Sequence, residues 1–285
     1  MKVQAGFTLV ELVIALVLAV IVTAFAGMFI GNSVTGYTDQ VRRAALVDAA
    51  DSALGQLARD IRGALPNSVR VTPAGGGFAV ELLASTDGVR YRDAAPPADP
   101  ARWLQFDSAD DQFNALGGFQ RVTLPFSSTS HYLSVYNAGV PGADAWELAN
   151  VITPPGTQID IVVDAIAGEH HVTVTPAFRF AYPSPTQRAY LVSGPVSWLC
   201  DPSAGTLTRY SGYAIASNHL SRDSAAELLA AGAAASRIAD DVSACSLNYT
   251  SGTAQRSGLV SARLELERSN ERVALMQQVH VVNVP

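Results

Sequence analysis

The sequence predicts an α+β protein in which one long amino-terminal helix packs on an antiparallel β-sheet head. Residues 7–30 form a nearly unbroken apolar run. Apolar residues then recur at three- and four-residue steps as far as residue 64, which is the period of an amphipathic helix. After Pro66 the pattern changes to short stretches in which apolar and polar residues alternate, as in half-buried strands. These three observations give the fold class.

The apolar run 7–30 is long enough to cross a membrane, because a helix needs roughly 20 residues to span the hydrocarbon core. No charged side chain occurs from Leu12 to Thr38. Glu11 is the exception within the run. A charged side chain in a spanning helix costs roughly 2.5 to 3.5 kcal/mol near the centre and less near an end. An acid at this position therefore calls for a partner.

The helix is expected to continue beyond the membrane and to cover residues 7–65, a rod of roughly 90 Å at 1.5 Å per residue. Its apolar stripe consists of Val34, Tyr37, Val41, Ala44, Val47, Ala50, Leu54, Leu57, Ile61 and Ala64. Pro66 should end it, since the residue before a proline is pushed out of the helical region. Gly27, Gly31 and Gly36 either weaken the rod locally or, through the spacing of Gly27 and Gly31, permit close helix packing.

Residues 66–285 are expected to form one β-rich head, because the Pro-rich loops at 94–100 and 153–156 are too short to be interdomain linkers. The expected strands are 69–72, 78–83, 103–106, 122–126, 132–136, 159–164, 171–175, 189–192, 196–200 and 206–210. The clearest hairpin joins residues 262–266 to 273–281 through Ser269 and Asn270. A short helix should begin at Ser224, which forms a capping-box pattern with Glu227.

The first residues carry a resemblance. A short leader with Lys2 that ends in Gly6, followed by Phe7, Thr8, Leu9, Glu11 and an apolar helix, resembles the signal of type IV prepilins and type II secretion pseudopilins. The resemblance implies that residues 1–6 are removed by an inner-membrane prepilin peptidase between Gly6 and Phe7. It also implies N-methylation of Phe7 and charge pairing of Glu11 during assembly. The new Phe7 amine would lie one helical turn from Glu11, within the same chain or on a neighbour.

Two other interpretations of the apolar run explain less. An ordinary secretory signal has an apolar core of about 7 to 15 residues with its cleavage site behind it. A plain signal anchor accounts for the length of the run but leaves Glu11 and the order of residues 6–11 as coincidence.

Several segments of the head and upper helix resemble the MshO family of minor pilins from MSHA biogenesis. They are residues 40–48, 65–71, 192–201, 210–215, Cys245 and 278–285, whereas residues 94–156 match only weakly. This resemblance implies a type IV pilus of MSHA type, with the protein at the pilus tip or in the priming complex. The alternatives are a type II secretion minor pseudopilin and a membrane-tethered periplasmic adhesin or enzyme with a pilin-like anchor.

The same resemblance implies the partners and the location. The partners would be the prepilin peptidase, major and minor pilins, the inner-membrane assembly platform and membrane lipid. The protein would cross the inner membrane once, hold its head in the periplasm, and later reach the pilus at the cell surface. A net charge of −6 provides no basic face for nucleic acid.

Cys200 and Cys245 are the only cysteines, and a single pair in an exported domain indicates a disulfide. Two unrelated buried thiols are the alternative. The bond would stabilise the fold by about 4 kcal/mol on the chain-entropy model.

Other residue clusters indicate no enzyme and no cofactor. His170 and His171 lie on an expected strand, where neighbouring side chains face opposite ways, so a solvent-exposed pair is expected rather than a shared metal. Asp107, Asp110 and Asp111 lack the closing glutamate of a calcium loop. Ser193-Gly194 is not a nucleophile elbow, and there is no P-loop. Trp103, Trp146 and Trp198 are expected in the core or at its rim rather than as a sugar platform.

Overall fold

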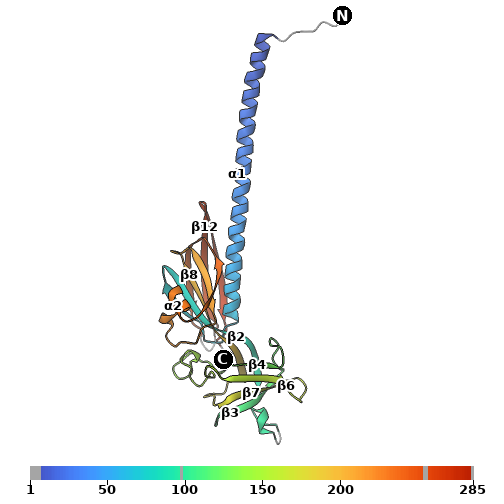
Figure 1. Ribbon diagram of the computed structural model, residues 1–285, viewed down its shortest axis with the longest axis vertical. Coiled ribbons are helices and arrows are strands. Elements are labelled where there is room, and N and C mark those ends of the chain that lie inside the picture. Colours follow the sequence, from blue (N-terminus) through green and yellow to red (C-terminus); the bar gives the residue numbers. More distant parts are fainter. Residues whose placement is uncertain (1–7, 97–98, 253–255, 284–285) are drawn as a thin grey trace.

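The computed structural model describes residues 8–96, 99–252 and 256–283, and it shows one long helix that carries a β-rich head at its carboxyl-terminal end (Figure 1). The helix α1 covers Leu9–Arg62. Its 54 residues correspond to a rod of about 80 Å at 1.5 Å per residue. An apolar helix followed by an antiparallel sheet-rich part is the α+β layout that the sequence predicts.

The helix ends at Arg62, three residues before the predicted end. Gly63 is a poor helix former, and its N–H closes the last turn by donating to the Arg59 carbonyl. The next residues then pair with a strand instead of extending the helix: the Leu65 N–H donates to the Leu83 carbonyl at 2.8 Å. Ala64 forms a bridge to Ala84 in the same way. The pairing with the sheet, not Pro66, therefore sets the end.

The remaining elements lie in the head. The strands are β1 Arg70–Ala74, β2 Gly77–Tyr91, β3 Asp110–Leu116, β4 Phe126–Ser128, β5 Tyr132–Val135, β6 Gln158–Val163, β7 Glu169–Phe178, β8 Arg188–Asp201, β9 Thr206–Ser211, β10 Ala234–Ala239, β11 Val242–Thr250, β12 Gly258–Arg268 and β13 Glu271–Val281. The second α-helix is α2 Ala225–Ala230, and short 3-10 turns occur at Pro100–Arg102, Ala145–Glu147 and His219–Ser221.

Every strand pair is antiparallel, and the described strands form two sheets. The larger sheet has the order β10-β9-β8-β2-β3-β7-β6-β4, with β1 added on β2 and β5 on β8. The smaller sheet has the order β11-β12-β13. The predicted hairpin is β12–β13, where Arg268 pairs with Glu271 across a two-residue turn. Both turn residues, Ser269 and Asn270, have positive φ angles, as the tight turns of twisted hairpins require.

Several predicted strands are wrong. Residues 103–106 follow a 3-10 turn and form no strand, although Leu104 is buried, and of residues 122–126 only Phe126 is in a strand. The stretches 189–192 and 196–200 are parts of the single strand β8. The sequence reading missed three strands altogether, namely β3, β10 and β11. The short helix predicted at Ser224 is confirmed as α2, with the Ser224 hydroxyl accepting from the Glu227 N–H.

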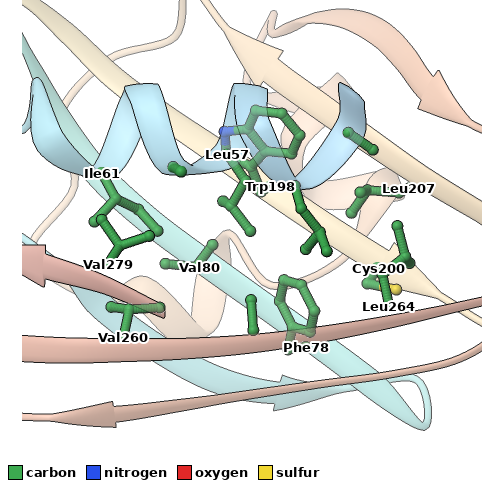
Figure 2. Packing of buried hydrophobic residues seen from close by; sticks show 14 of the residues in the cluster. Leu57, Ile61, Phe78, Val80, Trp198, Cys200, Leu207, Val260, Leu264 and Val279 are labelled. Atoms are coloured by element: carbon green, nitrogen blue, oxygen red, sulfur yellow. The ribbon is translucent and has the colours of Figure 1, made fainter. Parts of the chain in front are cut away.

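The upper core is enclosed by α1, the upper part of the large sheet and the small sheet (Figure 2). Leu57 and Ile61 of α1 pack there with Trp198 of β8 and Val279 of β13. The buried positions of the helix are Leu46, Ala50, Ala53, Leu54, Leu57, Ala58 and Ile61. The head thus covers only the last third of α1, and the predicted stripe is buried only in that part.

A second core lies below the first, away from α1. It is formed by β3, β5, β6, β7 and the lower ends of β2 and β8, with Phe113, Ile161 and Val172 fully buried. The strands β2 and β8 are shared by both cores. Their pairing shifts register on both sides of Ser85, which pairs with Val192. The preceding pair is Ala84 with Gly194, whose φ of 119° lies in a region that side chains rarely adopt. The large sheet of the head therefore bends between these two cores and is accompanied by the small sheet, whereas the sequence indicated a single sheet wrapped on the helix.

The predicted disulfide is confirmed. Cys200 of β8 and Cys245 of β11 are bonded with Cα atoms 6.7 Å apart, so the bond joins the large sheet to the small one. Gly77 makes room for it, because a Cβ there would lie 2.1 Å from the Cys200 carbonyl oxygen and 2.8 Å from the Cys245 sulfur.

Candidate functional site

The start of α1 is fixed by a cap that involves the acid of the motif. Thr8 is the N-cap, with extended backbone angles, and its hydroxyl accepts from the Glu11 N–H at 3.2 Å. The Thr8 carbonyl accepts from the Leu12 N–H at 3.1 Å. This cap was missed at the sequence level, although Thr8 followed three residues later by Glu11 is a capping-box pattern that could have shown it.

Glu11 is exposed in the first turn of the helix. There the unpaired backbone N–H groups and the helix dipole favour a negative charge. No ion pair involves its carboxylate within residues 8–96, 99–252 and 256–283. Gly6 and Phe7, the predicted cleavage and methylation residues, lie outside the described residues, so the pairing of Glu11 with the Phe7 amine stays a prediction.

Residues Leu9–Phe29 have the length and composition of a membrane span, with a mean hydropathy of 2.8. None of this surface is covered by the residues that the structure describes. Thr23 carries a polar side chain in it, and its hydroxyl donates within the helix to the carbonyls of Ala19 and Val20. Apart from Glu11, this segment is apolar with its one hydroxyl bonded within the helix, and such a surface suits lipid or neighbouring helices. Together with the motif at its start, this segment is a membrane anchor.

Between the anchor and the head, α1 exposes an apolar stretch that the sequence placed under the head. Val34, Tyr37 and Val41 are 56%, 69% and 51% exposed. The predicted stripe is correct in period, but the head does not extend far enough along α1 to cover these residues. A face of this kind is available to other molecules.

The sequence suggested that the glycines of α1 either weaken the helix locally or permit close helix packing, and the structure can be compared with both. The helix is continuous through them. A Cβ at Gly27 or Gly36 would have nothing within 4 Å, so no contact inside the chain requires glycine there. Of the two interpretations, close packing against a neighbouring helix therefore remains as a structural reason for glycine at these positions.

The helix is attached to the head through Asp60. One oxygen, Oδ2, accepts from the Trp198 indole N–H at 2.8 Å and from the Arg209 guanidinium at 2.7 Å. Trp198 is fully buried. Since β8 and β9 supply the two donors, this carboxylate fixes the helix against the large sheet as well as in the apolar core.

A second buried network holds the region just after the helix. The Arg70 guanidinium pairs with Glu81 at 2.5 Å and lies 3.6 Å above the Trp146 ring, while the Tyr213 hydroxyl donates to Glu81 at 2.8 Å. Burial raises the pKa of the Glu81 carboxyl, despite the opposing charge of Arg70. Burial likewise raises the pKa of the Tyr213 hydroxyl and lowers the pKa of the Arg70 guanidinium. The network ties β1, β2 and the loop after β9 together.

The three tryptophans lie in or at the edge of the core. Trp146 is buried and its indole N–H donates to the Ser68 carbonyl at 2.9 Å, Trp198 is buried as described, and Trp103 is half-buried.

The two histidines are not the solvent-exposed pair that was predicted. Both are half-buried. The His170 Nδ1 accepts from the Phe119 N–H at 2.9 Å, and the His171 ring bonds to the Asn114 and Gln112 side chains. Each ring therefore has partners of its own.

Of the aspartates considered for calcium, Asp107 accepts from the Ser108 hydroxyl at 3.4 Å, and Asp110 binds the backbone. Asp110 accepts from the Gln105 N–H at 2.8 Å. In the part of the chain that the structure describes, no three His, Cys, Asp or Glu residues form a group that could hold a metal ion.

Comparison with known proteins gives one match. Residues 1–27 match the family described as the prokaryotic N-terminal methylation motif, which indicates a prepilin of the type IV pilin or pseudopilin type. Such a motif implies processing by a prepilin peptidase and use of the pilin assembly machinery in general. No curated protein and no solved structure matches the chain.

Proposed function

We propose that this protein is a minor pilin that initiates or caps a type IV pilus of MSHA type. Prepilin peptidase would remove residues 1–6, and Phe7 would become the N-methylated amino terminus. The chain would then cross the inner membrane once through 7–30, hold residues 66–285 in the periplasm, and leave the membrane on joining the filament. The single observation that carries the proposal is the motif over residues 1–27, which runs directly into an uncovered apolar helix.

The geometry of α1 supports assembly. One unbroken helix presents an apolar surface over Leu9–Phe29, exposes Val34, Tyr37 and Val41 beyond it, and then enters the head. A subunit of this shape can exchange lipid for neighbouring helices along its upper part while its head stays folded. The Cys200–Cys245 bond is consistent with an oxidising compartment such as the periplasm.

The size of the head supports a terminal position in the filament. The upper core of the described head packs beside α1, and the lower core extends beyond the end of the helix (Figure 1). A bulky head is most easily accommodated where no further subunit lies above it. No catalytic role is proposed, since the polar networks of the described head serve to hold its elements together.

Two alternatives remain distinct from this proposal. The MSHA assignment depends on the resemblance of the head segments to MshO, so a minor pseudopilin of type II secretion is the second candidate. Deleting the gene would abolish surface pili under the first proposal and secretion of exported enzymes under the second. A membrane-tethered adhesin or enzyme would remain in the membrane and be absent from sheared filaments.

The Glu11→Ala variant tests the assembly role. We expect the variant to be processed and inserted in the membrane but to be reduced at least about tenfold in sheared filaments, because the buried charge pair with a neighbour is lost. The matched control is Asp48→Asn, which removes an exposed acid of α1 outside the membrane segment and should incorporate normally. Equal incorporation of Glu11→Ala and wild type would contradict the pairing.

A further inference from the structure

A cleft lies where the end of α1, the bend of the large sheet and the end of β13 meet. Its cavity of about 310 Å³ is lined by Arg62 and Gly63 of the helix end, by Ser85 and Gly88 of β2, and by Val282. A second cavity of about 260 Å³ adjoins it and shares Gly88, Arg188 and Tyr190 with the first. Together they form an elongated site between the two cores of the head.

Three arginines, Arg62, Arg121 and Arg188, are among the residues that line the first cavity. All three residues are exposed. None has a carboxylate partner among the residues that the structure describes, although most other arginines of the head are paired. In a chain with a net charge of −6, three unpaired cations around one cavity form a local positive field.

The one acid in the cavity is already engaged. Asp87 accepts from the backbone N–H groups of Gln120 at 2.6 Å and Arg121 at 2.8 Å through Oδ2, and from Gly88 at 2.9 Å through Oδ1. Its carboxylate therefore anchors the 117–121 loop and places Arg121 at the cleft. It does not form an ion pair with the arginine side chains.

Tyr190 supplies a second, independent observation. It lines both cavities, and its hydroxyl is buried without a hydrogen-bond partner in the described chain. Because this hydroxyl has no contact with solvent, a ligand in the cleft would meet the ring of Tyr190 rather than its oxygen. The ring packs closely over Gly88, where a Cβ would lie 3.2 Å from two ring carbons, so the tyrosine is held in place.

The carbonyl end of α1 also faces this region and opposes an anion. Part of that effect is removed, because the Gly63 carbonyl accepts from the Ser85 N–H at 2.9 Å. Three full positive charges exceed the partial charge that remains at a helix end.

We propose that this cleft binds an acidic saccharide, with a carboxylate or sulfate group held by Arg62, Arg121 and Arg188 and a neighbouring sugar unit in the second cavity. Guanidinium groups recognise such oxyanions through paired hydrogen bonds. The lining is largely polar and offers few apolar pockets of the kind that anchor peptide side chains. The two adjoining cavities suit a short chain of polar units. This binding function goes beyond the proposed role in filament assembly and does not depend on it.

The test is calorimetric titration of the full-length protein in detergent with trigalacturonate. Maltotriose is the neutral control ligand. A blocked tri-aspartate peptide, which carries the same number of carboxylates as trigalacturonate, is the control for charge. We expect saturable binding of trigalacturonate that weakens as the salt concentration is raised. Maltotriose and the tri-aspartate peptide should each bind at least about tenfold more weakly. The proposal would be overturned if maltotriose or inorganic sulfate bound as tightly as trigalacturonate, or if the peptide bound more tightly than it. It would also be overturned if none of these compounds bound.

Variants locate the site. Arg188→Gln and Arg121→Gln should each lower the affinity for trigalacturonate at least about tenfold, because each removes a charge-assisted hydrogen bond. Arg237→Gln is the control, since Arg237 is exposed at the sheet edge and paired with Asp240. Tyr190→Ala removes the ring that lines both cavities and should lower the affinity at least about threefold. An unchanged affinity in all three cleft variants, or an equal loss in Arg237→Gln, would show that the ligand binds elsewhere.

Discussion

At the scale of single residues, Asp60 joins the helix to the head. Its carboxylate receives the Trp198 indole N–H and the Arg209 guanidinium, which lie 138 and 149 residues away in the chain. A sequence pattern can place Asp60 on the helix and Trp198 on a strand. It cannot reveal that they meet, because this depends on how the sheet bends over the helix.

Asp60→Ala should destabilise the protein by about 2 to 4 kcal/mol, because it leaves a buried indole N–H and a half-buried guanidinium without their acceptor. Chemical denaturation followed by tryptophan fluorescence measures this change. Asp51→Ala is the control, since Asp51 is exposed on the same helix, and it should change the free energy of unfolding by less than about 0.5 kcal/mol. Equal effects of the two variants would show that the Asp60 contacts contribute nothing.

Asp201 makes the stability of the head depend on acid. The Ser203 hydroxyl, with the N–H groups of Ala204 and Ser203, donates to one oxygen of Asp201 and holds the pKa of this carboxyl below its ordinary value of 3.8. Because the folded state favours the ionised form, its contribution is present above pH 3.8 and is lost as the pH falls below that value.

Asp201→Asn should therefore be less stable than wild type at pH 7, and the difference should shrink as the pH falls through 3.8. Denaturation midpoints of both proteins over this pH range measure the effect. A difference that stays constant or grows on acidification would contradict the role of this turn.

At the scale of elements, the long helix and the last hairpin could be predicted, because each has a strong period in its apolar residues. The positions 262, 264 and 266 alternate with charged residues, and the structure pairs them in β12–β13. The strands that were missed lack such a period. β10 consists mostly of exposed residues, and β11 has only one fully buried position.

The wrongly predicted strands show the opposite error. Residues 103–106 contain Trp103, Leu104 and Phe106, which suggests a strand by composition. Their apolar groups pack on the lower core from a loop, with Leu104 buried and Phe106 partly buried. Burial alone does not determine backbone conformation when a neighbouring strand is not available to pair.

The disulfide acts between elements. Breaking it by reduction, or in Cys245→Ala, should lower the stability by about 4 kcal/mol, as the chain-entropy model gives for a loop of 45 residues. Denaturation with and without reductant measures the loss, and reductant should have no effect on the variant. A loss below about 1 kcal/mol in both would mean that the two sheets hold together without the bond.

At the scale of the whole molecule, the sequence indicates a helix with a head but not a head with two cores. The bend at Ser85 and Gly194 carries no pattern that a single sequence reveals, because a glycine in a strand is compatible with several structures. The same bend creates the cleft, so the grouping of Arg62, Arg121 and Arg188 could not be predicted either. The amino-terminal motif was recognisable because its residues are contiguous.

The central claim is that residues 1–6 are a prepilin leader and that the remainder is an assembly subunit. Intact-protein mass spectrometry of material purified from cells with an active prepilin peptidase tests this directly. We predict a chain that begins at Phe7 and carries one extra methyl group, and a full-length precursor in Gly6→Val. A wild-type chain that retains Met1 to Gly6 would contradict the account.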